Sequence, residues 1–145
     1  MAEGVFRSLA KSNPRIGEID SAGTGAYHSL DPPDYRTMDT LHRHGITDYD
    51  HRARQVERQD FSTFDYIFAM DVHNLRDLQR LQKRAEREGP QAKASVMLFG
   101  EFCGKTKPEQ VIDPYYGADD GFNAVYEQVK RFSQNFLDQV VDKMV

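Results

Sequence analysis

The sequence has a single cysteine and no long apolar run, and each scarcity excludes a class of protein. Cys103 alone cannot form an intrachain disulfide framework, so we expect a reducing compartment, namely the cytoplasm. No stretch approaches the roughly 18 uncharged apolar residues that a membrane-spanning helix needs, so we expect no membrane partner. Glu3 and Arg7 interrupt the N-terminal region, which therefore does not resemble a signal peptide.

Excess basic charge and metal-ligand spacing are also absent. A formal net charge of −4 over 145 residues argues against nucleic acid as a partner, although it leaves room for a small local anion site. The histidines show no paired spacing with cysteine or carboxylates, so we expect neither a metal nor a cofactor. The length suits one domain, residues 1–145, with a single core.

Helical and strand patterns alternate along the chain. This alternation predicts an α/β fold with three layers, in which helices cover both faces of a parallel sheet. The run "DYIFAM" is apolar throughout, which is typical of a strand buried on both faces. Helices are predicted at 1–12, around Tyr35, Met38 and Leu41, after Asp71, and from Phe122 to Val140; strands are predicted at 15–23, 65–70 and 94–100.

The chain begins with a helix, "MAEGVFRSLAKS", which no strand precedes. A doubly wound domain normally opens with a strand, and the turn from this strand into the first helix is the usual site for a phosphate or a nucleotide. We therefore expect the domain to be incomplete at its N-terminus.

Three motifs combine small, aromatic and charged residues. In "VIDPYYG", Pro114 restricts Asp113 to extended backbone, and the carboxylate beside two tyrosines suggests a slot for a flat, charged ring. The spacing alone favours a turn whose tyrosines cover the edge of the core. Similarly, "DSAGTGAY" is either a close approach for a ligand or an ordinary strand exit, and "YDHRARQ" is either an anion patch or a solvated loop.

Six segments in register resemble the low-molecular-weight protein tyrosine phosphatases: "MAEGVF", "DSAGT", "PPDYR", "HGI", "ARQ…DF…FDYIFAMD…NLRDL" and "DPYYG". The resemblance covers nearly the whole chain. It implies a four-stranded parallel sheet and a phosphate loop, Cys-x5-Arg-Ser-Pro, between the first strand and the first helix. It also implies hydrolysis of phosphotyrosine proteins or small aryl phosphates through a Cys-phosphate intermediate.

The resemblance assigns roles to individual residues. Asp113 matches the general acid that protonates the leaving oxygen. Three tyrosines match the substrate pocket, and three further residues match positions that support the phosphate loop or lie near the site. The pocket residues are Tyr27, Tyr115 and Tyr116, and the supporting residues are Ser21, His51 and Asp71.

The phosphate loop itself has no counterpart. Cys-x5-Arg occurs nowhere, since Glu109 stands six positions after Cys103, and Cys103 has no evident base or helix N-terminus to activate it. We therefore expect a truncated phosphatase that is inactive as it stands. The alternatives are a non-catalytic pseudophosphatase or binding remnant and, less favoured, an arsenate reductase relative, a class that uses further cysteines absent here.

The resemblance also predicts a gap in the sheet. In the family's strand order, 2-1-3-4, the first strand lies between the counterparts of Ile16–Ser21 and Tyr66–Met70. Unpaired backbone groups on a buried strand are costly, and exposed strand edges pair with other chains. We therefore expect self-association through the unpaired edge.

Overall fold

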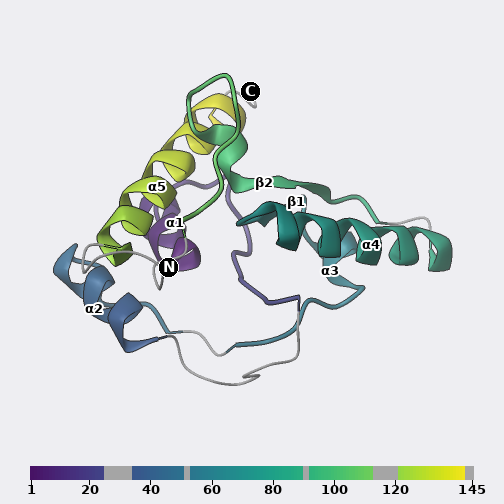
Figure 1. Ribbon diagram of the computed structural model, residues 1–145, viewed down its shortest axis with the longest axis horizontal. Coiled ribbons are helices and arrows are strands. Elements are labelled where there is room, and N and C mark those ends of the chain that lie inside the picture. The colour runs from purple at the N-terminus through teal and green to yellow at the C-terminus, as the bar shows by residue number, and fades with distance from the viewer. Residues whose placement is uncertain (25–33, 51–52, 90–91, 113–120, 143–145) are drawn as a thin grey trace.

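The computed structural model describes residues 1–24, 34–50, 53–89, 92–112 and 121–142. Figure 1 shows the helices and strands in order along the chain. The elements are α1 (Ala2–Ala10), α2 (Tyr35–Arg43), α3 (Asp60–Thr63), β1 (Tyr66–Ala69), α4 (Val72–Glu88), β2 (Ser95–Leu98), the 3-10 helix η1 (Phe99–Phe102), α5 (Gly121–Phe136) and the π-helical turn η3 (Leu137–Val141).

Strands β1 and β2 pair in parallel, from Tyr66 opposite Ser95 to Ala69 opposite Leu98. Successive side chains of β1 point to opposite faces of the sheet. Ala69 packs in a cluster with Leu78 and Ala85 of α4, whereas the ring of Phe68 lies 5.1 Å from that of Phe136 on α5. Helices therefore cover both faces, as the alternating pattern predicted, with α4 on one side and α1 and α5 on the other (Figure 1).

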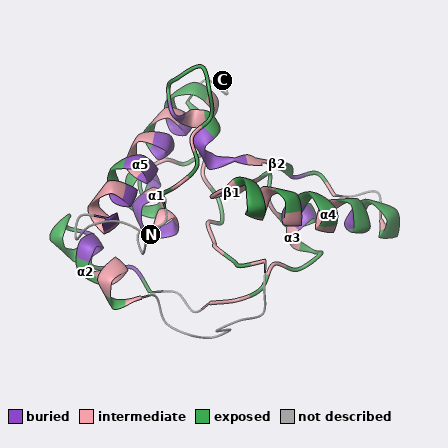
Figure 2. Cartoon of the chain, viewed as in Figure 1, coloured by how far each residue is buried: buried purple, intermediate pink, exposed green. Residues whose placement is uncertain are grey.

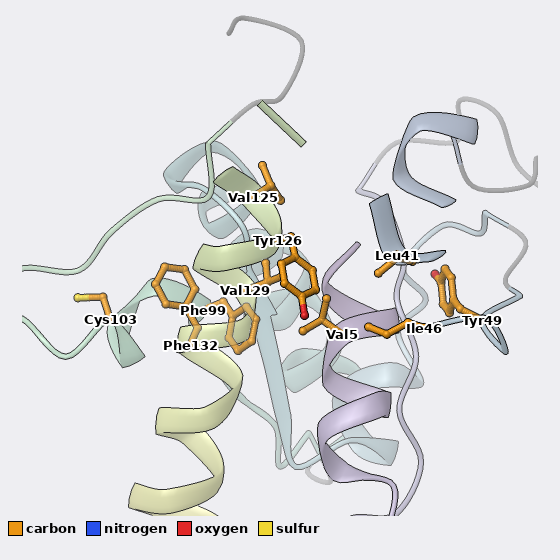
Figure 3. Packing of buried hydrophobic residues seen from close by; sticks show 10 residues of the cluster. All are labelled: Val5, Leu41, Ile46, Tyr49, Phe99, Cys103, Val125, Tyr126, Val129 and Phe132. Carbon is orange, nitrogen blue, oxygen red and sulfur yellow. The ribbon is translucent and has the colours of Figure 1, made fainter. Parts of the chain in front are cut away.

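The largest hydrophobic cluster joins α1, α2 and α5. Figure 3 shows Val5 of α1 beside Tyr126 and Val129 of α5, whereas Leu41 of α2 lies near Ile46 and Tyr49 on the other side of α1. Along α1 and α5, buried segments alternate with exposed ones, as expected for helices with one apolar stripe (Figure 2). The complete cluster is Val5, Leu41, Ile46, Tyr49, Phe99, Cys103, Val125, Tyr126, Val129 and Phe132.

Local sequence signals explain several helix boundaries. Helix α4 begins after Asp71, whose carboxylate accepts a 2.8 Å hydrogen bond from the backbone N–H of Asn74. Just past the end of α2, Gly45 adopts a φ of 81°, a conformation that favours glycine. These two residues therefore mark, to within a few positions, where the predicted helices end or begin.

Two predictions about strands were wrong. The 15–23 segment forms no strand: Gly23 alone makes a parallel bridge, to Gln55, and the carbonyl of Ile19 accepts from the Arg7 guanidinium. A strand needs a neighbour along its length, and within the described residues β1 and β2 pair only with each other. The "DYIFAM" strand is not fully buried either, because exposure falls along it from 36% at Tyr66 to 1% at Ala69.

None of the helices in the described residues is long and apolar enough to cross a membrane.

Candidate functional site

The carboxyl end of β1 brings three parts of the chain together. The backbone N–H of Val111 donates to the carbonyl of Met70 at 2.8 Å, and the N–H of Val72, the first residue of α4, donates to Oε1 of Gln110 at 3.0 Å. Asp71 lies between these two contacts and caps α4. In parallel α/β sheets, ligands bind outside this end of the strands, so this is the candidate site.

Helix α5 holds the segment that approaches this end of β1. The side chain of Gln128 accepts from the N–H of Ile112 at 2.8 Å and donates to the carbonyl of Gln110 at 3.0 Å. One turn later, Arg131 binds both carboxylate oxygens of Glu109, at 2.6 and 3.1 Å. The 109–112 segment is therefore anchored to α5 through side chains at two successive positions on one helix face.

The Glu109–Arg131 pair has strong electrostatic consequences. Hydrogen bonds from Arg131 are the largest cause that lowers the pKa of Glu109, to about 2; Gln128 and Lys105 add to the effect, and burial opposes it. The same contact raises the pKa of Arg131. Glu109 is therefore ionised in the folded protein at any pH near neutral.

Gly100 makes a close backbone approach to the same segment. Its carbonyl accepts from the N–H of Glu109 at 3.2 Å, and a Cβ atom at this position would lie 1.7 Å from the carbonyl oxygen of Glu109. Only glycine fits here, because the obstructing atom belongs to the backbone.

Ser21 is attached to the first turn of α1. Its hydroxyl donates to Oε1 of Glu3 at 2.8 Å, and the Glu3 side chain is 1% exposed and also pairs with Arg7 at 3.2 Å. Tyr49 lies beside this pair; burial is the main cause that raises its pKa to about 12, and the nearby Glu3 carboxylate adds to the effect. The buried carboxylate thus links α1 to the 20–24 segment.

Arg54 connects the 20–24 segment to α3. Its guanidinium donates to Oδ2 of Asp20 at 2.9 Å and to both carboxylate oxygens of Asp60, at 2.9 and 3.1 Å. These bonds, those to Asp60 first, raise the pKa of Arg54. The backbone bridge between Gly23 and Gln55 lies beside this contact.

The predicted site residues divide into two groups. Ser21 and Asp71 belong to the described residues and lie at the first turns of α1 and α4, respectively. The largest hydrophobic cluster is in contact with Met1 and Ala2 at the start of α1 and with Met70, the residue before Asp71. The predicted residues that lie outside the described part of the chain are Asp113, Tyr27, Tyr115, Tyr116 and His51.

The sequence did not indicate five residues that hold the segments around the site: Glu3, Arg54, Glu109, Gln128 and Arg131. Arg54 and Asp60 stand within the motif "ARQ…DF", which was a usable signal. Gln128 and Arg131 occupy polar positions beside the apolar stripe of α5, and nothing local distinguishes them from solvated residues.

Cys103 lies in the buried core and not at the candidate site. Cys103 is 2% exposed, and its Sγ lies 3.2 Å from the carbonyl oxygen of Lys107. Within the described ranges, no group of three or more His, Cys, Asp or Glu side chains could hold a metal ion.

These features define an α/β domain whose candidate site lies at the carboxyl end of its parallel strands. A family profile described as "Low molecular weight phosphotyrosine protein phosphatase" matches residues 1–145. The chain belongs to this family.

Relatives and solved structures agree with this assignment. The chain is 45% identical to the low molecular weight phosphotyrosine protein phosphatase of Schizosaccharomyces pombe over 97% of this chain and 87% of that protein. It is 42% identical to the Homo sapiens protein of the same name, over 96% of this chain and 85% of that protein. Among solved structures it is similar to a drosophila arginine phosphatase, with 33% identity, a TM-score of 0.84, and coverage of 95% and 87%. It is also similar to a protein tyrosine phosphatase from Entamoeba histolytica, with 30% identity and a TM-score of 0.81. That match covers 99% of this chain and 89% of the other.

Proposed function

We propose that the site at the carboxyl end of β1 serves hydrolysis of phosphotyrosine proteins or small aryl phosphates, with Asp113 as the general acid. One observation supports this proposal above the others. Ile112, the residue before Asp113, has its backbone N–H bonded to Gln128 beside the carboxyl end of β1. A general acid must be held within hydrogen-bond reach of the leaving oxygen, and a positioned one contributes about 10²–10⁴-fold.

The remaining roles follow from the family. We propose that Tyr27, Tyr115 and Tyr116 line the pocket for the aromatic ring of the substrate. Ser21 and His51 would support the phosphate loop, and Asp71 would lie near the reacting phosphate. The bond from Ser21 to the buried Glu3 supports the first of these, because it fixes the hydroxyl beside the first turn of α1.

Residues 1–145, taken alone, are proposed to lack turnover. In cysteine phosphatases a thiolate attacks phosphorus while an arginine and loop amides hold the equatorial oxygens. The sequence contains no Cys-x5-Arg, and the buried Cys103 directs its sulfur toward backbone carbonyls. The chain as it stands would be a non-catalytic phosphatase domain that retains a substrate-binding surface.

Hydrolysis of p-nitrophenyl phosphate tests this directly. We expect the 145-residue chain and its Cys103→Ser variant to release product equally, at the rate of buffer. A version that carries the family's first strand and phosphate loop before Met1 should turn over. Activity in the 145-residue chain that disappears with Cys103→Ser would show that Cys103 is the nucleophile and would overturn the proposal.

Three further properties are proposed. Within the described residues β1 has one strand neighbour, β2, and a strand edge without a neighbour can pair with a second chain. We propose weak self-association through this edge, a single domain over residues 1–145, and a reducing cytoplasmic compartment consistent with one buried cysteine.

A further inference from the structure

Gln128 is a buried polar residue on a helix that contributes mostly apolar side chains to the core. Gln128 lies on α5 directly before the buried Val129, and the residue is 7% exposed. Burying a carboxamide without hydrogen bonds is costly, so its partners explain why it is there.

Within the described part of the chain, the hydrogen-bond partners of Gln128 all lie in the 109–112 segment. Oε1 accepts from the N–H of Ile112 at 2.8 Å, and Nε2 donates to the carbonyl of Gln110 at 3.0 Å and to Oε1 of Glu109 at 3.2 Å. A backbone N–H only donates and a carbonyl only accepts. These partners therefore fix the orientation of the Gln128 side-chain amide, with Oε1 toward the N–H of Ile112 and Nε2 toward the carbonyl of Gln110. No carboxylate or ammonium side chain could satisfy both kinds of partner.

The helix that carries Gln128 is itself firmly placed. Val129 and Phe132 are fully buried, and α5 packs against α1 and α2 through the largest hydrophobic cluster. A side chain projecting from such a helix is a fixed reference point for the backbone bonded to it. The last backbone N–H fixed in this way belongs to Ile112, one residue before Asp113.

We propose that Gln128 is a positioning residue, which fixes the backbone at Ile112 and so aims the general acid at the next position, Asp113. This inference rests on the role proposed above for Asp113. It assigns to a residue of α5, 15 positions further along the chain, control over proton transfer to the leaving group.

The first test uses the 145-residue chain and does not depend on activity. Amide hydrogen exchange should show the Ile112 N–H protected in the wild type, comparably to that of Val111, which donates to Met70. In Gln128→Met, which keeps the volume, exchange at Ile112 should rise about fivefold or more, as expected for losing a neutral hydrogen bond. The matched control is Gln134→Met, an exposed position on the same helix, which should change nothing at Ile112.

The second test uses the version extended by the family's first strand and phosphate loop. Gln128→Met should lower kcat for a phosphate ester with a poor leaving group, such as phenyl phosphate, by up to about 100-fold, as expected for misplacing a catalytic group by about 1 Å. The kcat for an ester with a good leaving group and the KM for both should change little. A structural defect alone would lower both kcat values in proportion to the folded fraction.

The possible outcomes separate the two proposals. An Ile112 amide that exchanges at its unprotected rate in the wild type would overturn the anchoring by Gln128, whether or not any variant folds. Faster exchange in Gln128→Met with equal loss for both esters would overturn the positioning role. If Asp113→Ala has no leaving-group-dependent effect while the Ile112 amide responds as expected, the role of Asp113 is wrong and the anchor stands.

Discussion

Replacing Glu109 with glutamine tests the ion pair that fastens the 109–112 segment to α5. The carboxylate accepts from both terminal nitrogens of Arg131 and from Gln128, and Lys105 lies 3.5 Å away. Glutamine keeps the shape of the side chain but removes its charge. The variant therefore removes the negative charge and also replaces one of the two acceptor oxygens with an NH2 donor.

The expected loss follows from the lowered pKa. The decrease from 4.5 to about 2 corresponds to about 3 kcal/mol, since one pKa unit is worth about 1.36 kcal/mol. Glu109 is 22% exposed and Arg131 is 38% exposed, so solvent screening reduces this to about 1–2 kcal/mol. Because the folded-state pKa is below the unfolded one, this stabilisation is present above about pH 4.5 and is lost as the pH falls toward 2.

Urea unfolding followed by circular dichroism measures the effect. We expect Glu109→Gln to unfold more easily than the wild type at pH 7, and the two proteins to converge as the pH falls from 4.5 toward 2. The control is Glu127→Gln, an exposed position on the same helix, which should differ little from wild type. A difference for Glu109→Gln that stays constant from neutral to acid pH would refute the electrostatic explanation.

Four other outcomes are expected. Gly100→Ala should destabilise the protein by up to about 3 kcal/mol, because the added Cβ would overlap the Glu109 carbonyl. The control Gly17→Ala should not, because a Cβ there would have no atom within 4 Å. Equal melting temperatures for the two variants would contradict this. Asp71→Ala should cost about 1 kcal/mol by removing the cap of α4, and an unchanged thermal transition would argue against the cap. In the extended version, Asp113→Ala should lower turnover by about 10²–10⁴-fold, less for good leaving groups; an equal loss for all esters would contradict a general acid. Sedimentation velocity should show the 145-residue chain self-associating more than the extended version, and a strictly monomeric chain at high concentration would exclude pairing through the β1 edge.

Local sequence patterns predicted the parts of the fold that depend on neighbouring residues. The apolar stripe of α5 and the capping carboxylate of Asp71 act within a few positions along the chain, and both are confirmed. The parallel pairing of two apolar runs also followed, because strands joined by a helix pair in parallel.

Features that depend on distant partners could not be predicted in this way. The 15–23 segment has the composition of a strand, but a strand is defined by the neighbour it pairs with, and the described chain provides only the bridge at Gly23. The contacts of Glu109 with Arg131 and Gln128 join residues 22 and 19 positions apart. Glu3 looks like an ordinary acidic residue of a first helical turn, and only the folded chain shows it buried against Ser21.

The close contact between Gly100 and Glu109 has a consequence for engineering the protein. Both ends of the intervening loop are tied: the Gly100 carbonyl accepts from the N–H groups of Cys103 and Glu109, each at 3.2 Å. Residues 104–108 between these ties are exposed. Doubling the length of a flexible loop costs only about 0.6 kcal/mol in closure entropy. A peptide tag or fluorescent label inserted after Thr106 should therefore be tolerated without displacing the segment that leads into the site.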